Sequence, residues 1–329
     1  MLSRRLFHAF QWSVSIALVW YLLTKIDLVK FVDALRNVDV LLLLFSVLQL
    51  TLQPLLGAWR WQLIANTLDG RLKFVVALRF VWIGIFFSQA LPGTVGGDLV
   101  RMWLYYRERA SRRLAVNSVT VERMLMVLSL VVVVALVQPG LAARSGSLVP
   151  QWLPMLLLLV AALGIGVLIW STRFLARLGN WLPVRAITSI AQDLRKVLFN
   201  PVAFAAIALL SMLAYLNMAI AAWLIAIALD LDVSLRDCIV LIPVVALVAT
   251  IPLSIGGWGV REGAMMILFG SVGVLPADAV TLSVLFGIAG IVVSFPGVVL
   301  WLSAGHRRSE LQAAGDIVRD DTANDKPIA

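Results

Sequence analysis

The chain has 329 residues, of which 61% are hydrophobic and 14% charged, and its mean hydropathy is +0.97. Soluble domains carry charge on about a quarter of their residues, so this composition excludes an ordinary soluble protein and indicates an integral membrane protein. The net charge of +9 does not call for nucleic acid as a partner, because basic cytoplasmic loops beside anionic lipid account for it. A single cysteine, Cys238, excludes an internal disulfide and a cysteine-based metal cluster, and we expect no cofactor.

Several apolar stretches are long enough to cross a hydrocarbon layer of about 30 Å as a helix of about 20 residues. They cover residues 6–25, 38–59, 118–138, 150–170, 202–229 and 278–303. Two further apolar segments, 74–90 and 238–255, each lead into a Gly/Pro-rich stretch. The alternating pattern of a membrane β-barrel is absent, and helices satisfy their own backbone groups in lipid. The sequence therefore predicts an all-α polytopic membrane protein with six to eight transmembrane helices.

Two segments repeat one motif. LPGTVGGDLVR at 91–101 and IPLSIGGWGVR at 251–261 both have a proline, then Gly-Gly, then Val-Arg at the same spacing, after an apolar run. Gly/Pro interruptions at corresponding points of two hydrophobic halves indicate the binding site of a secondary transporter. We interpret the chain as an internal duplication, with membrane half-repeats at 1–138 and 139–303. The polar residues 304–329 are expected to form a disordered cytoplasmic tail.

The distribution of Arg and Lys suggests a topology. Basic residues gather at the N-terminus, at 101–113 and at 173–196, and the positive-inside rule places all three in the cytoplasm. If both shorter apolar segments crossed fully, as hydropathy alone suggests, the 101–113 stretch would lie outside. The conflict disappears if the motifs at 91–101 and 251–262 are tips of re-entrant hairpins that open to opposite sides. This arrangement predicts an inverted repeat with both termini in the cytoplasm.

The motif can expose backbone amides to an anion. Proline ends the incoming helix and Gly-Gly permits backbone angles that other residues avoid. The next helix then begins with free N–H groups and a favourable dipole, and an arginine follows within about a turn. A lipid phosphate is the anion most available at this depth. Alternatively, the glycines and prolines only kink helices for packing. The candidate headgroup-binding residues are Arg101, Arg261, Gly96, Gly97, Gly256 and Gly257.

Ionisable residues in apolar surroundings form a second group of candidates, because a central charge in a membrane helix costs about 2.5–3.5 kcal/mol and normally faces a partner or a wet cavity. We expect Glu122-Arg123 and Arg261-Glu262 each to open a helix. Sequence neighbours point about 100° apart, so each charge should pair elsewhere, including between the halves. Glu122 and Glu262 either stabilise helix N-termini, or balance the motif arginines, or bind a cationic headgroup or a proton. The charged candidates are Arg79, Asp98, Glu122, Arg123 and Glu262.

The segment 184–199 is amphipathic. One face is apolar, and the other carries Ser189, Gln192, Asp193, Arg195 and Lys196. We expect this helix to lie flat on the cytoplasmic surface, with binding of a partner as the alternative. Many of the twelve Trp residues, Trp61 among them, fall near predicted span ends, as in an interfacial aromatic belt. Trp258 lies inside the second motif, where it either packs or walls a cavity.

At these residues the chain resembles the flippase-like family named for the transmembrane region of lysylphosphatidylglycerol synthases. The resemblance covers residues 6–303 and is carried by the motifs at Pro92–Arg101, Ser118–Arg123 and Pro252–Gly263, the last being long and distinctive. It implies a multi-pass protein of the cytoplasmic (inner) membrane that handles phospholipid, isoprenoid or hopanoid-type lipids.

The resemblance also transfers headgroup contact to particular residues, namely Arg101, Glu122, Arg261 and Glu262. The synthases carry a large soluble aminoacyl-transfer domain, whereas a short tail follows Trp301 here, so lysyl transfer is not expected of this stand-alone member.

The favoured function is that of a lipid translocase whose partners are membrane lipids; the absence of a Walker motif argues against direct driving by ATP. One alternative is a membrane-embedded transferase that would use the acidic residues Asp230, Asp232 and Asp237. Another is an accessory subunit that binds an enzyme of lipid or lipid-linked glycan biosynthesis.

Overall fold

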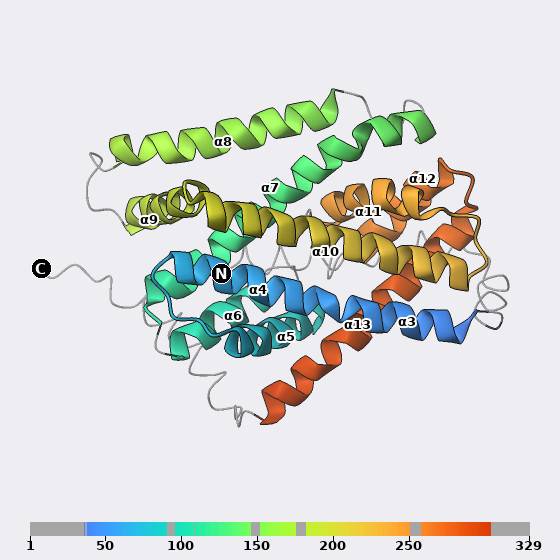
Figure 1. Ribbon diagram of the computed structural model, residues 1–329, viewed down its shortest axis with the longest axis horizontal. Helices are drawn as coiled ribbons and strands as arrows, with labels where there is room; N and C mark the ends of the chain where they lie inside the picture. Colours follow the sequence, from blue (N-terminus) through green and yellow to red (C-terminus); the bar gives the residue numbers. More distant parts are fainter. Residues whose placement is uncertain are drawn as a thin grey trace, which may run out of the picture.

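The computed structural model describes residues 36, 38–90, 96–108, 110–145, 152–175, 182–250 and 258–303. All regular structure in these residues is α-helical (Figure 1). The helices are α3 (Val40–Leu50), α4 (Leu52–Thr67), α5 (Phe74–Ala90), α6 (Gly96–Arg107), α7 (Arg112–Ser145), α8 (Leu153–Leu175), α9 (Leu182–Leu198), α10 (Pro201–Ala228), α11 (Leu235–Ala249), α12 (Val260–Gly270) and α13 (Pro276–Ser303).

Four helical stretches among the described residues are long and apolar enough to cross a membrane. They are Val40–Thr67, which joins α3 and α4, Arg112–Val137, Pro201–Ala228 and Pro276–Ser303. These confirm four of the predicted spans. The predicted span at 150–170 is helical as α8, with a shorter apolar portion, and the predicted span at 6–25 lies outside the described residues. The chain is therefore a multi-pass membrane protein.

Helix starts follow from local sequence. The Asp39 carboxylate accepts hydrogen bonds from the amides of Leu41 and Leu42 and so begins α3. Asn200 caps α10, with Pro201 as the first helical residue, and Ser234 with Asp237 forms a capping box on α11. Each cap satisfies amides that the helix cannot pair by itself. These caps fix where the long helices begin.

The helices that precede the two short helix pairs, α4 before α5–α6 and α10 before α11–α12, run through the centre of the molecule (Figure 1). α4 and α10 lie side by side (Figure 1). The Asn217 side chain of α10 joins it to both α4 and α3, because it donates to Gln53 of α4 at 3.1 Å and accepts from Gln49 of α3 at 2.7 Å. Interhelical amide bonds of this kind hold membrane helices together.

In the view of Figure 1, the short helix pair α5–α6 lies next to α4 and the pair α11–α12 lies next to α10. Each pair packs against the long helix that follows the other motif: α5 contacts α13, and α11 contacts α7. A Cβ on Gly297 of α13 would lie 2.2 Å from the carbonyl oxygen of Trp82 on α5, so glycine is required for this close approach. Helices of the N-terminal part of the chain, α5 and α7, therefore pack directly against helices of the C-terminal part, α13 and α11.

Many large apolar side chains on the outer helices are exposed, including Leu41 of α3, Trp170 of α8 and Val202 of α10. Exposed apolar faces on spanning helices are expected where lipid is the solvent. The interior is closely packed, and Cys238 of α11 is fully buried there.

The amphipathic segment does form a helix, α9, but its polar face is not wholly solvated. Asp193 is buried, accepts from Asn117, and pairs with Arg113 of α7 at 2.9 Å. The apolar face of α9 packs on α4 and α7. The assignment of Asp193 to an exposed polar face was therefore wrong, because a buried carboxylate takes partners from the neighbouring helix.

Candidate functional site

The first motif ends in a buried charge network. Arg101 of α6 donates to Glu122 of α7 at 2.5 Å, and Arg60 of α4 donates to the other carboxylate oxygen of Glu122 at 3.0 Å. Asp98, in the first turn of α6, pairs with Arg123 of α7 and lies 3.5 Å from Arg101. Three helices thus supply three arginines and two carboxylates to one cluster.

Arg101 also makes a cation–π contact with an aromatic ring. Its guanidinium carbon lies 4.4 Å from the ring centroid of Trp61, whose indole N–H donates to Ser118 at 3.1 Å. Trp61 is fully buried, so its assignment to an interfacial belt was wrong. A Cβ on Gly84 would lie 2.7 Å from the Arg101 stem, and the glycine therefore makes room for the arginine. The cation–π contact and the two carboxylates fix the Arg101 side chain.

The second motif holds its arginine in a more local way. Arg261 donates to its sequence neighbour Glu262 at 2.7 Å and to Ser283 of α13 at 3.1 Å. The other Glu262 oxygen accepts from the amide of Gly259 at 2.5 Å, which caps α12. Arg261 also lies 4.8 Å from the ring centroid of Trp258. In both motifs an arginine stacks on a tryptophan and binds a buried carboxylate.

Some expectations for the charged residues fail. Glu122 and Arg123 lie well inside α7 and do not open a helix, so Glu122 cannot act as an N-terminal residue. Arg261 pairs with its own neighbour Glu262 at 2.7 Å, because the flexible arginine side chain is long enough to reach the adjacent carboxylate. The expected partners elsewhere are found for Glu122 and Arg123, but they belong to the same half.

The other candidates have mixed outcomes. Glu262 does stabilise a helix start. Gly96 and Gly97 begin α6 and are buried, and a Cβ on Gly97 would lie 2.1 Å from the carbonyl oxygen of Gly84. Arg79 is exposed on α5. Gly256 and Gly257 lie outside the described residues.

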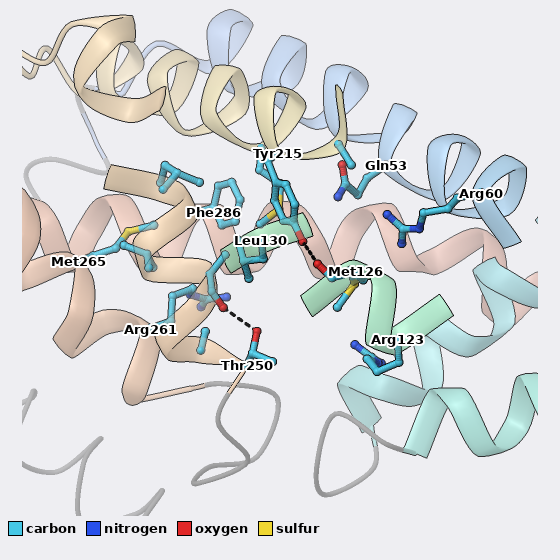
Figure 2. Close-up of a pocket in the computed structure, with 16 residues that line it drawn as sticks. Gln53, Arg60, Arg123, Met126, Leu130, Tyr215, Thr250, Arg261, Met265 and Phe286 are labelled. Carbon is cyan, nitrogen blue, oxygen red and sulfur yellow. Dashed lines mark hydrogen bonds between the residues drawn. The ribbon is translucent and has the colours of Figure 1, made fainter. Parts of the chain in front are cut away.

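A cavity of about 280 Å³ separates the two charge clusters. Arg60 and Arg123 approach it from one side and Arg261 from the other (Figure 2). Tyr215 lies between them, and its hydroxyl donates to the Met126 carbonyl at 2.9 Å. The remaining wall is mainly apolar, from α7, α10, α11 and α13.

The cavity lies at the mid-depth of the spanning helices. Tyr215 is at the centre of α10, and Met126 and Phe286 lie near the middle of the spans Arg112–Val137 and Pro276–Ser303. Charges at this depth of a membrane protein mark a substrate path or a functional site. The position is also where secondary transporters bind their substrates.

The two clusters together carry excess positive charge. Four arginines, Arg60, Arg101, Arg123 and Arg261, lie with three carboxylates, Asp98, Glu122 and Glu262, so positive charges outnumber negative ones among these residues. The Nε atoms of Arg60 and Arg101 are buried and have no hydrogen-bond acceptor among the described residues. An anion with several oxygens suits such donors better than an apolar ligand does.

A second cavity, also about 280 Å³, lies on the α5–α6 side. Ser88 and Gln89 of α5 line it together with Gly97, Asp98 and Arg101 of α6. Arg123 borders both cavities. This arginine is therefore placed to contact a ligand in either cavity.

Sequence reasoning missed several of these residues. Arg60 is a lone cation in an apolar helix, so the criterion that selected Glu122 would also have found it. Gln53, Tyr215 and Ser283 carry no such signal, because amides and hydroxyls are common in membrane helices and their position depends on tertiary packing.

These features define a class: polytopic α-helical membrane proteins with an arginine-lined cavity at mid-depth. Within it, the chain belongs to the family described as lysylphosphatidylglycerol synthase TM region, whose family model matches residues 9–297. No curated protein matches the chain.

Proposed function

We propose that this protein binds a polar lipid through its phosphate-bearing headgroup and moves it across the cytoplasmic membrane. The observation that carries the proposal is the cavity between Arg60, Arg123 and Arg261, at mid-depth of the spans and with positive charge in excess. Guanidinium groups match phosphate oxygens in geometry and charge. Membership of a family named for a lipid synthase's membrane region agrees with a lipid as ligand.

In this proposal the chain is an inverted repeat whose halves, 1–138 and 139–303, present motif hairpins from opposite faces of the membrane. The headgroup first meets the arginines of one half and is then transferred to those of the other. Arg123 takes part in both contacts because it borders both cavities. The carboxylates Asp98, Glu122 and Glu262 hold the arginines when no headgroup is present. N- and C-termini are in the cytoplasm.

The transferase alternative has less support. The Asp237 carboxylate accepts from the backbone and hydroxyl of Ser234 and so serves the start of α11. In the part of the chain that the structure describes, no three His, Cys, Asp or Glu residues are grouped so as to hold a metal ion. Asp230, Asp232 and Asp237 therefore offer no three-carboxylate metal site for transfer chemistry.

The test is lipid translocation in proteoliposomes that contain a fluorescent anionic phospholipid. Arg261→Gln removes one cavity charge, and Arg79→Gln, at an exposed position, is the matched control. A lost charged hydrogen bond costs about 1.5–3 kcal/mol, so Arg261→Gln should slow translocation about tenfold or more. Equal rates for wild type and Arg261→Gln, with the variant correctly folded, would overturn the proposal.

A further inference from the structure

An apolar groove adjoins the arginine cavity. It has a volume of about 330 Å³ and lies between α7, α10 and α11. Tyr215 lines both the groove and the cavity, so the two spaces lie against the same side chain. Leu213 and Leu216 of α10 line the groove, and its other lining side chains are apolar except for Tyr215.

The groove opens to the surface of the spanning helices. Leu136 of α7 is 64% exposed, and Leu209 and Met212 of α10 are 58% and 50% exposed. Its deep wall is formed by buried Val133 and Ala219. The exposed side of the groove therefore faces the hydrocarbon that surrounds the spanning helices.

The chemistry of the two spaces is complementary to that of one amphiphile. The cavity presents three arginine side chains, and the groove presents hydrocarbon, with the phenol of Tyr215 as its one polar side chain. The Tyr215 hydroxyl is held by the Met126 carbonyl, so the aromatic ring forms a fixed boundary between the charged and apolar parts. An aromatic residue with one polar end suits a boundary of this kind.

We propose that the groove holds an acyl chain of the same lipid whose phosphate headgroup occupies the arginine cavity. The inference rests on the proposed lipid-binding function and specifies how the substrate is bound: headgroup at Arg60, Arg123 and Arg261, chain along Leu213 and Leu216. The ligand is then an anionic phospholipid with at least one long chain, in contrast to a free anion or a water-soluble phosphate.

The test compares two probes, dihexanoyl and dioleoyl phosphatidylglycerol, whose headgroups are identical and whose chains differ. Leu213→Trp fills the groove from its lipid-facing side, where Leu213 is 42% exposed. Phe204→Trp is the control on the same helix, at a 39% exposed residue that does not line the groove. Binding is measured on the purified full chain by native mass spectrometry and by competition with a fluorescent lipid.

Leu213→Trp should weaken binding of the dioleoyl lipid about tenfold, because several buried methylenes lose their contacts. Binding of the dihexanoyl lipid should stay within about twofold of wild type, and Phe204→Trp should change neither. Arg261→Gln should weaken the binding of both lipids. Leu213→Ala, which enlarges the groove, provides a second variant if the tryptophan prevents folding, and it should alter the preference for chain length.

Each outcome separates this inference from the proposed function. If Leu213→Trp and Leu213→Ala leave dioleoyl binding unchanged while Arg261→Gln weakens it, the groove assignment is wrong and the headgroup site stands. If the arginine variant changes neither lipid, the headgroup site itself is wrong. Equal loss in Leu213→Trp and Phe204→Trp would mean that bulk lipid contact, not the groove, determines binding, and would also reject the assignment.

Discussion

The two copies of the motif hold their arginines by different means. In the first, Arg101 binds Glu122 on the next long helix, and Arg60 reaches the same carboxylate from α4. In the second, Arg261 binds the adjacent residue Glu262, which also caps α12. The first cluster ties three helices together, whereas the second is largely built within one helix start and α13.

This difference has a consequence for stability and for ligand binding. The first cluster has three arginines and two carboxylates, and the second has one of each. Loss of Glu122 in the first cluster removes a carboxylate partner from two arginines, whereas loss of Glu262 in the second removes it from one. Among the described residues the carboxylate that pairs with Arg261 is its sequence neighbour Glu262, so exchange of this carboxylate for a phosphate should disturb the helix packing less than exchange of Glu122 would.

The largest expected effect comes from removing the shared carboxylate. Glu122→Gln removes the buried carboxylate that Arg60 binds and the nearer of the two carboxylates beside Arg101, and it should destabilise the fold by about 3–5 kcal/mol. Glu262→Gln keeps a carbonyl oxygen for the cap and should cost about 1–2 kcal/mol. Thermal unfolding of the two purified variants in detergent gives the comparison, and equal losses would contradict the proposed difference between the clusters.

The next effect concerns the packing of the first helix pair. A Cβ on Gly97 would lie 2.1 Å from the Gly84 carbonyl oxygen and from the Ser88 hydroxyl. Gly97→Ala should therefore cost about 1–3 kcal/mol or more by overpacking. Gly263 on α12 has no atom within 4 Å of such a Cβ, and Gly263→Ala should be neutral or stabilising. A stable Gly97→Ala protein would show that α5 and α6 can separate freely.

A smaller effect is expected at the serines that support each arginine. Ser118→Ala leaves the buried indole N–H of Trp61 without its acceptor and should cost about 1–3 kcal/mol. Ser283→Ala should cost about 0.5–1 kcal/mol, because Arg261 Nε still has Glu262 within 3.2 Å. Chemical denaturation would measure the loss in unfolding free energy for each variant, with Ser303→Ala, at an exposed position, as the control. The reverse ranking would contradict the contacts assigned to Trp61.

The smallest effect on stability is expected at Gly287. A Cβ there would lie 2.3 Å from the end of the Arg261 side chain, which is flexible enough to move. Gly287→Ala should therefore change stability by less than about 1 kcal/mol, since the added methyl meets mainly a movable group. Lipid translocation should nevertheless fall, because Arg261 no longer faces the cavity in the same way. Unchanged translocation would indicate that the exact position of Arg261 does not matter.

The sequence predicted the fold class and much of the charged site, for identifiable reasons. Long apolar stretches determine spanning helices directly, and the repeated motif singled out Arg101 and Arg261. Burial and partners depend on tertiary contacts, so the sequence placed Trp61 at an interface and Asp193 on a polar face, and both are buried. Glu122 was misplaced at a helix start because α7 begins earlier, at Arg112.

The cavity itself could not be foreseen, since it is formed by helices from both ends of the chain. Gln53 of α4 and Phe286 of α13 are more than two hundred residues apart and line the same space. The residue pattern within one helix does not indicate which side chains of distant helices will line the same cavity.

The full burial of Cys238 makes the wild-type chain a ready background for thiol chemistry, because its only sulfhydryl is shielded from reagents in solution. A single cysteine introduced at Glu108, after α6, or at Leu275, before α13, would occupy an exposed turn. Membrane-impermeant maleimides applied to intact cells and to inverted vesicles then report the side on which each turn lies. Opposite sides are expected for an inverted repeat, and the same side for both would rule it out.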